Sequence, residues 1–362
     1  MSLPDAERDL TVTREVPSEQ PPGAVLSIRD LHVEFPTDDG VVKAVDGLSY
    51  DIYPNEVLGI VGESGSGKSV SSLAILGLLP KRARITGQVL YRGRNLLTLR
   101  DREMNGLRGA KIAMVFQDAL AALNPVYSVG AQISEAVQVH NPKVGKGELR
   151  DRAIALLDLV GTPNPSKRVD QFPHEFSGGM RQRAMIAMAL ANDPDVLIAD
   201  EPTTALDVTI QAQVLDVIER VQERTNSAIV LITHDLGVVA GVADRVMVMY
   251  AGRSAELATV DEIFYETRHP YTLGLLASLP RLDQDAEGMR LHRIKGQPPS
   301  LINVPTGCPF HPRCEFRKLP EPCATAIPEF RVIEGADHRS ACHFAEELRT
   351  TKPGDLQPVA QV

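Results

Sequence analysis

The sequence predicts an α/β fold built around a parallel sheet, and two observations lead to that prediction. First, short continuous apolar runs recur along the chain, as expected for strands that are buried on both faces; they occupy residues 57–61, 112–116, 196–199, 229–232 and 246–250. Second, a glycine-rich loop follows the first run and leads into an apolar helical pattern at residues 70–79, which we expect Pro80 to end. A strand, a loop and a helix in this order are typical of phosphate-binding units.

The chain begins with a segment for which we expect disorder. Residues 1–24 are acidic and rich in proline and serine, and they lack the basic and then apolar pattern of a signal peptide. Residues 26–52 then alternate apolar and polar side chains in two runs, which predicts an antiparallel β subdomain. The apolar members are Leu26, Ile28, Val33 and Phe35 in the first run and Leu48, Tyr50 and Ile52 in the second.

The glycine-rich loop, residues 62–69, fits the pattern G-x-x-x-x-G-K-[ST] at every position. Its small residues let backbone N–H groups turn toward phosphate oxygens, and the following helix adds its positive end. A glycine- and serine-rich turn could match the pattern by chance, but the strand and the helix on either side favour a nucleotide-binding loop. The expected nucleotide contacts are Gly62, Ser64, Gly65, Ser66, Gly67, Lys68, Ser69 and Val70, with the Ser69 hydroxyl also serving Mg²⁺.

Two adjacent carboxylates, Asp200 and Glu201, follow the apolar run at residues 196–199. Asp200 would hold Mg²⁺ through its water shell, and Glu201 would polarise a water for attack on the γ-phosphate. Alone, two acids at such a place could equally begin a solvated turn. A second anion-binding pattern favours the catalytic interpretation, because Ser177, Gly178 and Gly179 open a predicted helix just upstream. Two such helix starts in one chain suggest that two chains share each nucleotide.

With these motifs in this order, the sequence resembles the ATP-binding cassette (ABC) ATPases over nearly all of its length. The resemblance identifies a Walker A loop (62–69), a Q-loop (115–118), a signature (176–180), a Walker B strand ending in Asp200-Glu201-Pro202, a D-loop (204–207) and a switch histidine, His234. It implies a P-loop cassette over residues 25–265, with a helical subdomain inserted at about residues 119–175. A helical stripe supports that subdomain; it consists of Leu149, Ala153, Leu156, Leu157 and Val160 and ends at Gly161.

The resemblance also assigns roles to single residues. Phe35 would stack on adenine, although a core phenylalanine fits its position nearly as well. Gln117 would touch Mg²⁺ or the attacking water, and His234 would donate to the γ-phosphate. Asp207, in the D-loop, belongs to the expected nucleotide-binding residues. Taken singly, a glutamine or a histidine at a strand end is more often solvated or structural, so these roles depend on the ordered set of motifs.

The last hundred residues resemble the C-terminal extension of peptide-importer ATPases. His269-Pro270-Tyr271-Thr272 and the leucines after it carry this resemblance. Together with Leu123-Asn124-Pro125 and the Phe-Ser-Gly-Gly-Met signature, they point to the first of the two paired ATPases of bacterial dipeptide and oligopeptide importers. We expect the extension at residues 266–346 and a flexible tail at residues 347–362. The implied function is ATP hydrolysis that energises peptide import, with nickel or another small solute as the alternative.

The resemblance implies partners as well. In this family two cassettes stack head to tail, so the signature of one closes over ATP on the Walker A loop of the other. We expect a second, similar ATPase subunit in a heterodimer, two transmembrane permease subunits and an extracytoplasmic solute-binding protein, with this chain on the cytoplasmic face of the membrane. The net charge of −9 over 362 residues argues against a nucleic-acid partner, and every apolar run is shorter than the roughly 20 residues that cross a bilayer.

Two rival classes fit the sequence less well. Soluble ABC ATPases of translation usually carry two cassettes, and those of DNA repair split their cassette with a long coiled coil, whereas this chain has one unsplit cassette. A small-molecule kinase would share the Walker A loop but neither the signature nor His234.

All four cysteines lie in the extension, as Cys308, Cys314, Cys323 and Cys342, with the spacing C-x5-C-x8-C-x18-C. A cytoplasmic location disfavours disulfides, and the spacing lacks the C-x2-C pairs typical of structural zinc. Four thiolates from irregular loops would suit a [4Fe–4S] cluster, and some of the importer ATPases that this region resembles hold one. We expect the cluster, with zinc and uncomplexed thiols as the alternatives.

Overall fold

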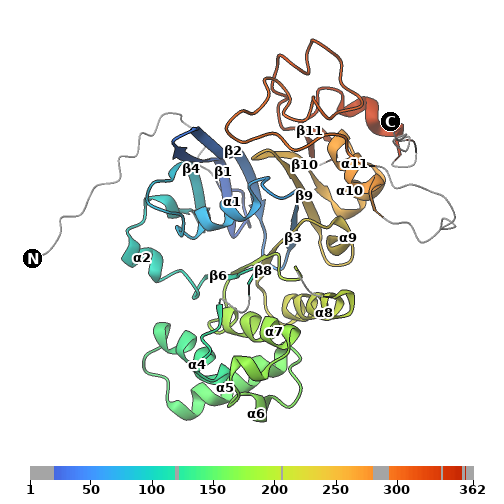
Figure 1. The fold of residues 1–362 in the computed structure, drawn as a ribbon. Helices are drawn as coiled ribbons and strands as arrows, with labels where there is room; N and C mark the ends of the chain where they lie inside the picture. Colours follow the sequence, from blue (N-terminus) through green and yellow to red (C-terminus); the bar gives the residue numbers. More distant parts are fainter. Residues whose placement is uncertain are drawn as a thin grey trace, which may run out of the picture.

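The computed structural model describes residues 20–118, 122–204, 207–279, 293–335, 337–352 and 355. Figure 1 shows two sheets in the body of the molecule, a group of helices below them and a loop-rich extension above. The expected disordered lead-in lies outside the described residues except for residues 20–24. Most of the expected tail and residues 205–206 of the D-loop also lie outside them.

The first sheet is antiparallel, as the alternating pattern predicted. Its strands in the described residues are β1 (Leu26–Thr37), β2 (Gly40–Ile52), β4 (Arg84–Tyr91) and β5 (Arg94–Asn95), in the order β2-β1-β4-β5. Residues Leu26, Ile28, Val33, Leu48 and Ile52 are fully buried on its inner face. They pack against one side of the second sheet, through residues such as Leu58 and Ile60.

The second sheet confirms the predicted parallel core. β6 (Ile112–Val115), β7 (Val196–Asp200), β8 (Ala228–Thr233), β3 (Val57–Val61) and β9 (Arg245–Tyr250) are parallel neighbours in that order. Three antiparallel strands that the sequence did not predict continue it, namely β10 (Arg253–Thr259), β12 (His338–Ser340) and β11 (Arg331–Glu334). The C-terminal extension therefore shares its sheet with the parallel core.

The helix after the glycine-rich loop, α1 (Lys68–Ile75), differs from the prediction at both ends. It begins two residues earlier than expected, because the loop's last residues already turn helically. It ends before Gly77, whose φ of 62° is a left-handed conformation that glycine adopts at little cost. Pro80 was therefore the wrong stop signal. The other helices of the body are α2 (Asp101–Asn105), α8 (Val208–Arg224), α9 (Leu236–Val239), α10 (Val260–Tyr265) and α11 (Pro270–Ala277), with a 3₁₀ turn, η1 (Leu96–Thr98).

The helices in the lower part of Figure 1 come from the segment between the Q-loop and the signature and from the helix that begins within the signature. They are α4 (Val129–His140), α5 (Lys146–Leu159), α6 (Pro165–Arg168), η2 (Pro173–Glu175) and α7 (Gly178–Ala189). The predicted stripe on α5 is buried, from Leu149 to Val160, against α4 and α7. Among the described residues, none of the helices has both the length and the apolar character needed to span a bilayer.

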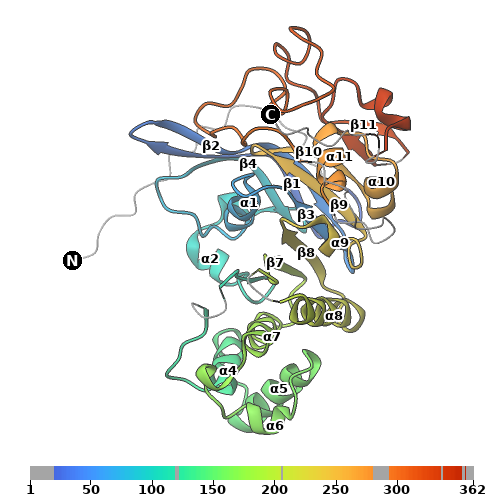
Figure 2. The ribbon, with the colours of Figure 1, turned by 45° about the vertical axis from the view of Figure 1, so that its right-hand side comes forward.

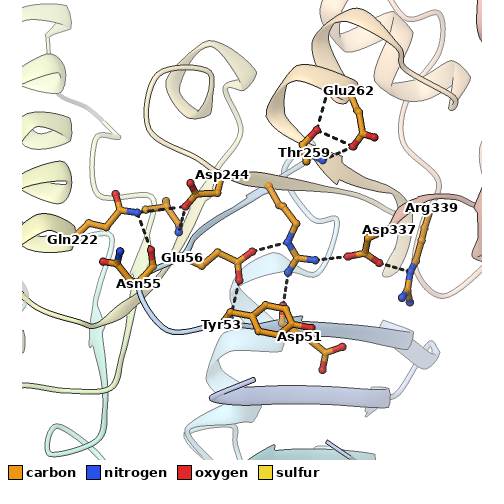
Figure 3. Close-up of polar contacts among 12 residues, drawn as sticks. Asp51, Tyr53, Asn55, Glu56, Gln222, Asp244, Thr259, Glu262, Asp337 and Arg339 are labelled. Carbon is orange, nitrogen blue, oxygen red and sulfur yellow. Dashed lines mark hydrogen bonds and ion pairs between the residues drawn. The ribbon is translucent and has the colours of Figure 1, made fainter. Parts of the chain in front are cut away.

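A network of charged side chains joins the two sheets to the extension (Figure 3). Arg245, at the start of β9, donates to Glu56 Oε1 at 2.6 Å, to Asp337 Oδ2 at 2.5 Å and to the Asp51 carbonyl at 2.8 Å. Asp337 also forms an ion pair with Arg339, at 2.9 Å between Oδ1 and Nε. The Arg245 side chain is only 13% exposed, and its contacts tie the β11–β12 hairpin to the body.

The extension continues further than the sequence indicated. Residues Ala345–Thr350 form a 3₁₀ helix, η3, and its Leu348 is 4% exposed. The start of the expected flexible tail, at residue 347, therefore falls inside ordered structure. A single leucine among charged residues gave too weak a signal to show that this turn is packed.

Candidate nucleotide-binding site

The glycine-rich loop has a shape that its sequence dictates. β3 ends at Val61 and α1 begins at Lys68, so the loop turns between them. Gly67 has a φ of 97°, and a Cβ there would collide with the Ala44 carbonyl, so a larger residue would force the loop to move. Lys68 reaches back over the loop and donates to the carbonyls of Gly62 at 2.6 Å and Glu63 at 3.0 Å.

Charge and burial compete at this loop. Burial lowers the pKa of the Lys68 ammonium, while the negative charges of Glu201 and Asp200 act in the opposite direction. An ammonium with one desolvated face and carboxylates close by is well suited to receive a polyanionic ligand, because phosphate oxygens would restore the contacts that water no longer supplies.

Ser69 and Asp200 meet at the end of the loop. The Ser69 hydroxyl donates to Asp200 Oδ1 at 2.9 Å, across 131 residues of sequence. Asp200 is 7% exposed, and burial raises its pKa, although the hydrogen bond from Ser69 opposes that shift. A hydroxyl and a carboxylate oxygen side by side are the hard donors that Mg²⁺ prefers. The sequence predicted both residues, and the structure brings them together.

Glu201 lies next to these residues and is the centre of a polar cluster. Its Oε2 accepts from Gln117 Nε2 at 3.0 Å and from Thr204 Oγ1 at 2.8 Å, and it lies 3.7 Å from His234 Nδ1. Its φ of 47° is in the left-handed region, which costs a residue other than glycine about 1 kcal/mol or more. Gln117, Glu201 and His234 come from the ends of three neighbouring strands, β6, β7 and β8.

The second predicted anion site lies elsewhere in the chain. Ser177 caps α7, accepting from the Met180 N–H at 3.4 Å, and Gly178 and Gly179 form the first turn. A Cβ on Gly179 would collide with Ile210 of α8. Figures 1 and 2 both place α7 with the lower helices and α1 in the upper body. The signature and the Walker A loop are therefore separate within one chain.

Two other predicted residues have structural contacts of their own. Asp207 caps α8 by accepting from the Ile210 N–H at 3.0 Å. Phe35, on β1, is partly buried and packs against the core beneath the first sheet. This packing agrees with the core role that the sequence left open for Phe35, and stacking on adenine stays a prediction.

The four cysteines line one cavity of about 200 Å³ in the extension. All four are free thiols; Cys314 and Cys323 are buried, and Cys308 and Cys342 are partly buried. Burial raises the pKa of Cys308, and it raises the pKa values of Cys314 and Cys342 to about 12. Within the described residues, no three His, Cys, Asp or Glu side chains are grouped as ligands of a single metal ion. The fold thus gathers the thiols without placing them as an ion site.

Three contacts of the site were not predicted from the sequence. Thr204 donates to Glu201, Tyr271 accepts from the Glu63 N–H, and Arg313 pairs with the Glu63 carboxylate. Tyr271 belongs to the motif that marked the extension, and Arg313 directly precedes Cys314. The contacts of these two residues were not predicted, because no local pattern connects them with a loop more than 200 residues away.

The fold and the site together define a P-loop nucleotide-binding cassette. A family model described as "ABC transporter" matches residues 45–204, and one described as "Oligopeptide/dipeptide transporter, C-terminal region" matches residues 255–321. The chain belongs to the ABC transporter family of ATP-binding proteins, in the branch that carries this C-terminal region.

Individual relatives agree with this membership. The chain is 52% identical over 335 residues to the oligopeptide transport ATP-binding protein OppD of Mycobacterium tuberculosis, covering 92% of this chain and 54% of that protein. It is 55% identical over 325 residues to the dipeptide transport ATP-binding protein DppD of Bacillus subtilis, covering 89% of this chain and 95% of that protein. The chain thus spans about half the length of the mycobacterial relative.

A solved structure supports the fold. The ATP-binding cassette MJ0796, in a dimeric post-hydrolysis state bound to ADP and Pi, has a TM-score of 0.59 and is 25% identical, covering 65% of this chain and 98% of that chain. The predicted cassette fold is therefore confirmed.

Proposed function

We propose that this chain binds and hydrolyses ATP to energise the import of oligopeptides or dipeptides across a bacterial cytoplasmic membrane. The observation that carries the proposal is the meeting of Gln117, Glu201 and His234 beside Lys68, in a chain with an oligopeptide/dipeptide transporter C-terminal region. The names of the OppD and DppD relatives support the solute class. Nickel or another small solute is the alternative.

ATP binding would use the Walker A loop. The backbone of residues 62–67 and the Lys68 ammonium would bind the phosphates, and Phe35 would lie against the adenine. Ser69, Asp200 and Gln117 would hold Mg²⁺, and their oxygen atoms suit that ion. When bound, Mg²⁺ supplies neutralisation of the charge on the phosphate oxygens.

Hydrolysis would depend on Glu201 as the base that polarises the attacking water. Gln117 and Thr204 already donate to Glu201 Oε2, so this oxygen is oriented before any water arrives. The second carboxylate oxygen is then available to accept a proton. The His234 side chain is 59% exposed, which leaves it room to donate to the γ-phosphate.

A complete site would need two chains. Because the signature lies apart from the Walker A loop within this chain, Ser177, Gly178 and Gly179 would close over ATP on a partner cassette, with Asp207 at the same interface. The dimeric state named for the matching structure supports this arrangement. We propose that the partner is a second, similar ATPase subunit in a heterodimer.

Transport would also need membrane partners. These would be two transmembrane permease subunits, fed by an extracytoplasmic solute-binding protein, with this chain bound peripherally on the cytoplasmic face. Three large apolar side chains between β6 and α4 are exposed and support a docking role for this segment: Phe116 at 42%, Val126 at 70% and Tyr127 at 56%. Phe116 directly precedes Gln117 in the sequence, so closure around ATP at Gln117 would move this segment.

The extension would hold the proposed [4Fe–4S] cluster. Cys308, Cys314, Cys323 and Cys342 around one cavity provide the four thiolates that such a cluster takes from a protein. The proposed layout is thus a cassette at residues 25–265 followed by a cysteine-bearing extension from residue 266.

The test is solute-dependent ATP hydrolysis by the reconstituted importer. The chain, its partner ATPase, the permeases and the solute-binding protein would be assembled in lipid vesicles, and phosphate release would be measured. Peptides should stimulate hydrolysis, whereas nickel should not. Stimulation by nickel and not by peptides would favour the alternative, a nickel importer. If phosphate were transferred to a small molecule instead of being released, both the peptide-importer and the nickel-importer proposals would be contradicted.

A further inference from the structure

One residue of the Walker A loop is held by the extension. Both carboxylate oxygens of Glu63 accept from Arg313, at 2.7 Å between Oε2 and Nη1 and at 2.9 Å between Oε1 and Nη2. The two residues are 250 positions apart. The Arg313 side chain is 6% exposed and that of Glu63 is 27% exposed. This two-point contact is therefore largely shielded from water, where charge-assisted hydrogen bonds are strong.

The backbone of Glu63 is held as well. Its N–H donates to the hydroxyl of Tyr271 at 2.9 Å, and its carbonyl accepts from Lys68 Nζ at 3.0 Å. Tyr271 belongs to α11 and is fully buried. The side chain, the N–H and the carbonyl of Glu63 are all engaged, the first two by residues that follow the cassette in the sequence.

Arg313 is itself fixed in place. Its Nε donates to the Lys295 carbonyl at 3.1 Å, and its guanidinium lies against the rings of Tyr250 and Phe310, at 5.7 and 6.0 Å from their centroids. The two rings pack edge to face, with their centroids 5.2 Å apart. A guanidinium held by two rings and by hydrogen bonds on both sides is a rigid anchor for the loop.

We infer that Arg313 is a positioning residue for ATP binding, fixing the Walker A loop through Glu63. The inference rests on the proposed ATP-binding role of that loop. A phosphate-binding loop acts through several backbone N–H groups at once, and holding them in place beforehand lowers the entropic cost of binding. Arg313 directly precedes Cys314, and Phe310 lines the cysteine cavity. Through Arg313, the conformation of the segment around Cys314 is thereby coupled to the conformation of the Walker A loop.

The test combines ATP affinity with hydrogen exchange on the purified full-length chain. Arg313→Ala and Glu63→Gln should each raise the Kd of a fluorescent ATP analogue about tenfold, or ~1.4 kcal/mol. The double variant should raise it little further, because both changes break the same pair. The Kd of Arg313→Lys should lie between those of the unaltered chain and Arg313→Ala, since an ammonium keeps the charge but cannot make the two-point contact. Amides of residues 62–67 should exchange faster in Arg313→Ala, and also in Cys314→Ser.

The matched control is Arg331→Ala. Arg331 makes the same kind of two-point contact, with Glu346 at 2.7 and 3.0 Å, but on the exposed surface of the extension and away from the Walker A loop. Arg331→Ala should leave the affinity for the ATP analogue and the hydrogen exchange of residues 62–67 unchanged. Glu63→Gln preserves the size of the side chain and removes its charge and one of its two acceptor oxygens, so it carries the test if Arg313→Ala does not fold.

The outcomes separate this inference from the proposed function. If the unaltered chain binds no ATP, the proposed function fails. If it binds ATP and both Arg313→Ala and Glu63→Gln bind it equally well, with unchanged exchange at residues 62–67, the inference alone is overturned. A lowered melting temperature with unchanged affinity and exchange would give Arg313 a purely structural role, which also overturns it.

Discussion

Replacing Glu201 by glutamine should stop hydrolysis and leave ATP bound. The substitution keeps the size of the side chain and one acceptor oxygen, so the contacts from Gln117 at 3.0 Å and Thr204 at 2.8 Å can largely persist. It removes the group that would take a proton from the attacking water. The polar cluster should therefore keep its shape and lose its base.

The expected magnitude follows from these contacts. Loss of a positioned base typically costs about 10²- to 10⁴-fold in rate, which is roughly 2.7–5.5 kcal/mol in activation free energy. Affinity should not fall, because Glu201 is one of the negative charges acting on Lys68. Removing that charge leaves the surroundings of the phosphates more positive. The rate constant for hydrolysis should thus drop while the Kd for ATP stays constant or decreases.

The assay is phosphate release under single-turnover conditions, together with ATP-dependent assembly with the partner ATPase by size-exclusion chromatography. Glu201→Gln should assemble in ATP and remain assembled. The control is Glu219→Gln, the same chemical change at an exposed position of α8, which should behave as the unaltered chain. Hydrolysis by Glu201→Gln at the unaltered rate would refute the assignment of the base.

Four further predictions follow from the same account. Lys68→Ala should lose ATP affinity or turnover rather than trap ATP, as equilibrium binding would show, and an unchanged affinity and turnover would contradict its role. The isolated chain should bind ATP but hydrolyse it slowly until the partner ATPase and permeases are added; full turnover alone would exclude a shared site. Anaerobically purified protein should contain iron and absorb visible light, and Cys314→Ser should remove both; zinc without iron, or no metal, would contradict the cluster. The hydrogen bond to Asp46 and the charge of Asp30 raise the pKa of His32, so its contribution to stability is complete below pH 6.5 and is lost as pH rises through that higher pKa. The difference in unfolding free energy between the unaltered chain and His32→Asn, about 1 kcal/mol or less for such a half-exposed group, should shrink over that range; a difference independent of pH would refute this.

The sequence predicted those parts of the fold that leave a local pattern. The strands of the parallel core are continuous apolar runs, and the strand β7 is buried at all five positions from Val196 to Asp200. β11 and β12 are only four and three residues long, too short to show an alternation. The end of α1 was missed because Gly77 stops the helix by adopting a positive φ, a property that Pro80 nearby obscured.

In the site, too, the residues with a local sequence motif were predicted and the long-range contacts were not. Lys68, Ser69 and Asp200 were predicted because each belongs to a motif with its own spacing, and the parallel order of β3, β8 and β7 brings those motifs to one edge. The contact of Glu63 with Arg313 had no such signal. Any glutamate in a loop is normally solvated, and only the folded extension shows which arginine meets it.

The most direct measurement is the uptake of a labelled peptide by sealed vesicles that contain the assembled importer, with ATP enclosed on the side of this chain. The account predicts that peptide accumulates with the unaltered chain, that Glu201→Gln abolishes accumulation while ATP stays bound, and that labelled nickel does not accumulate. Peptide uptake at the unaltered rate with Glu201→Gln, or uptake of nickel without uptake of peptide, would contradict it.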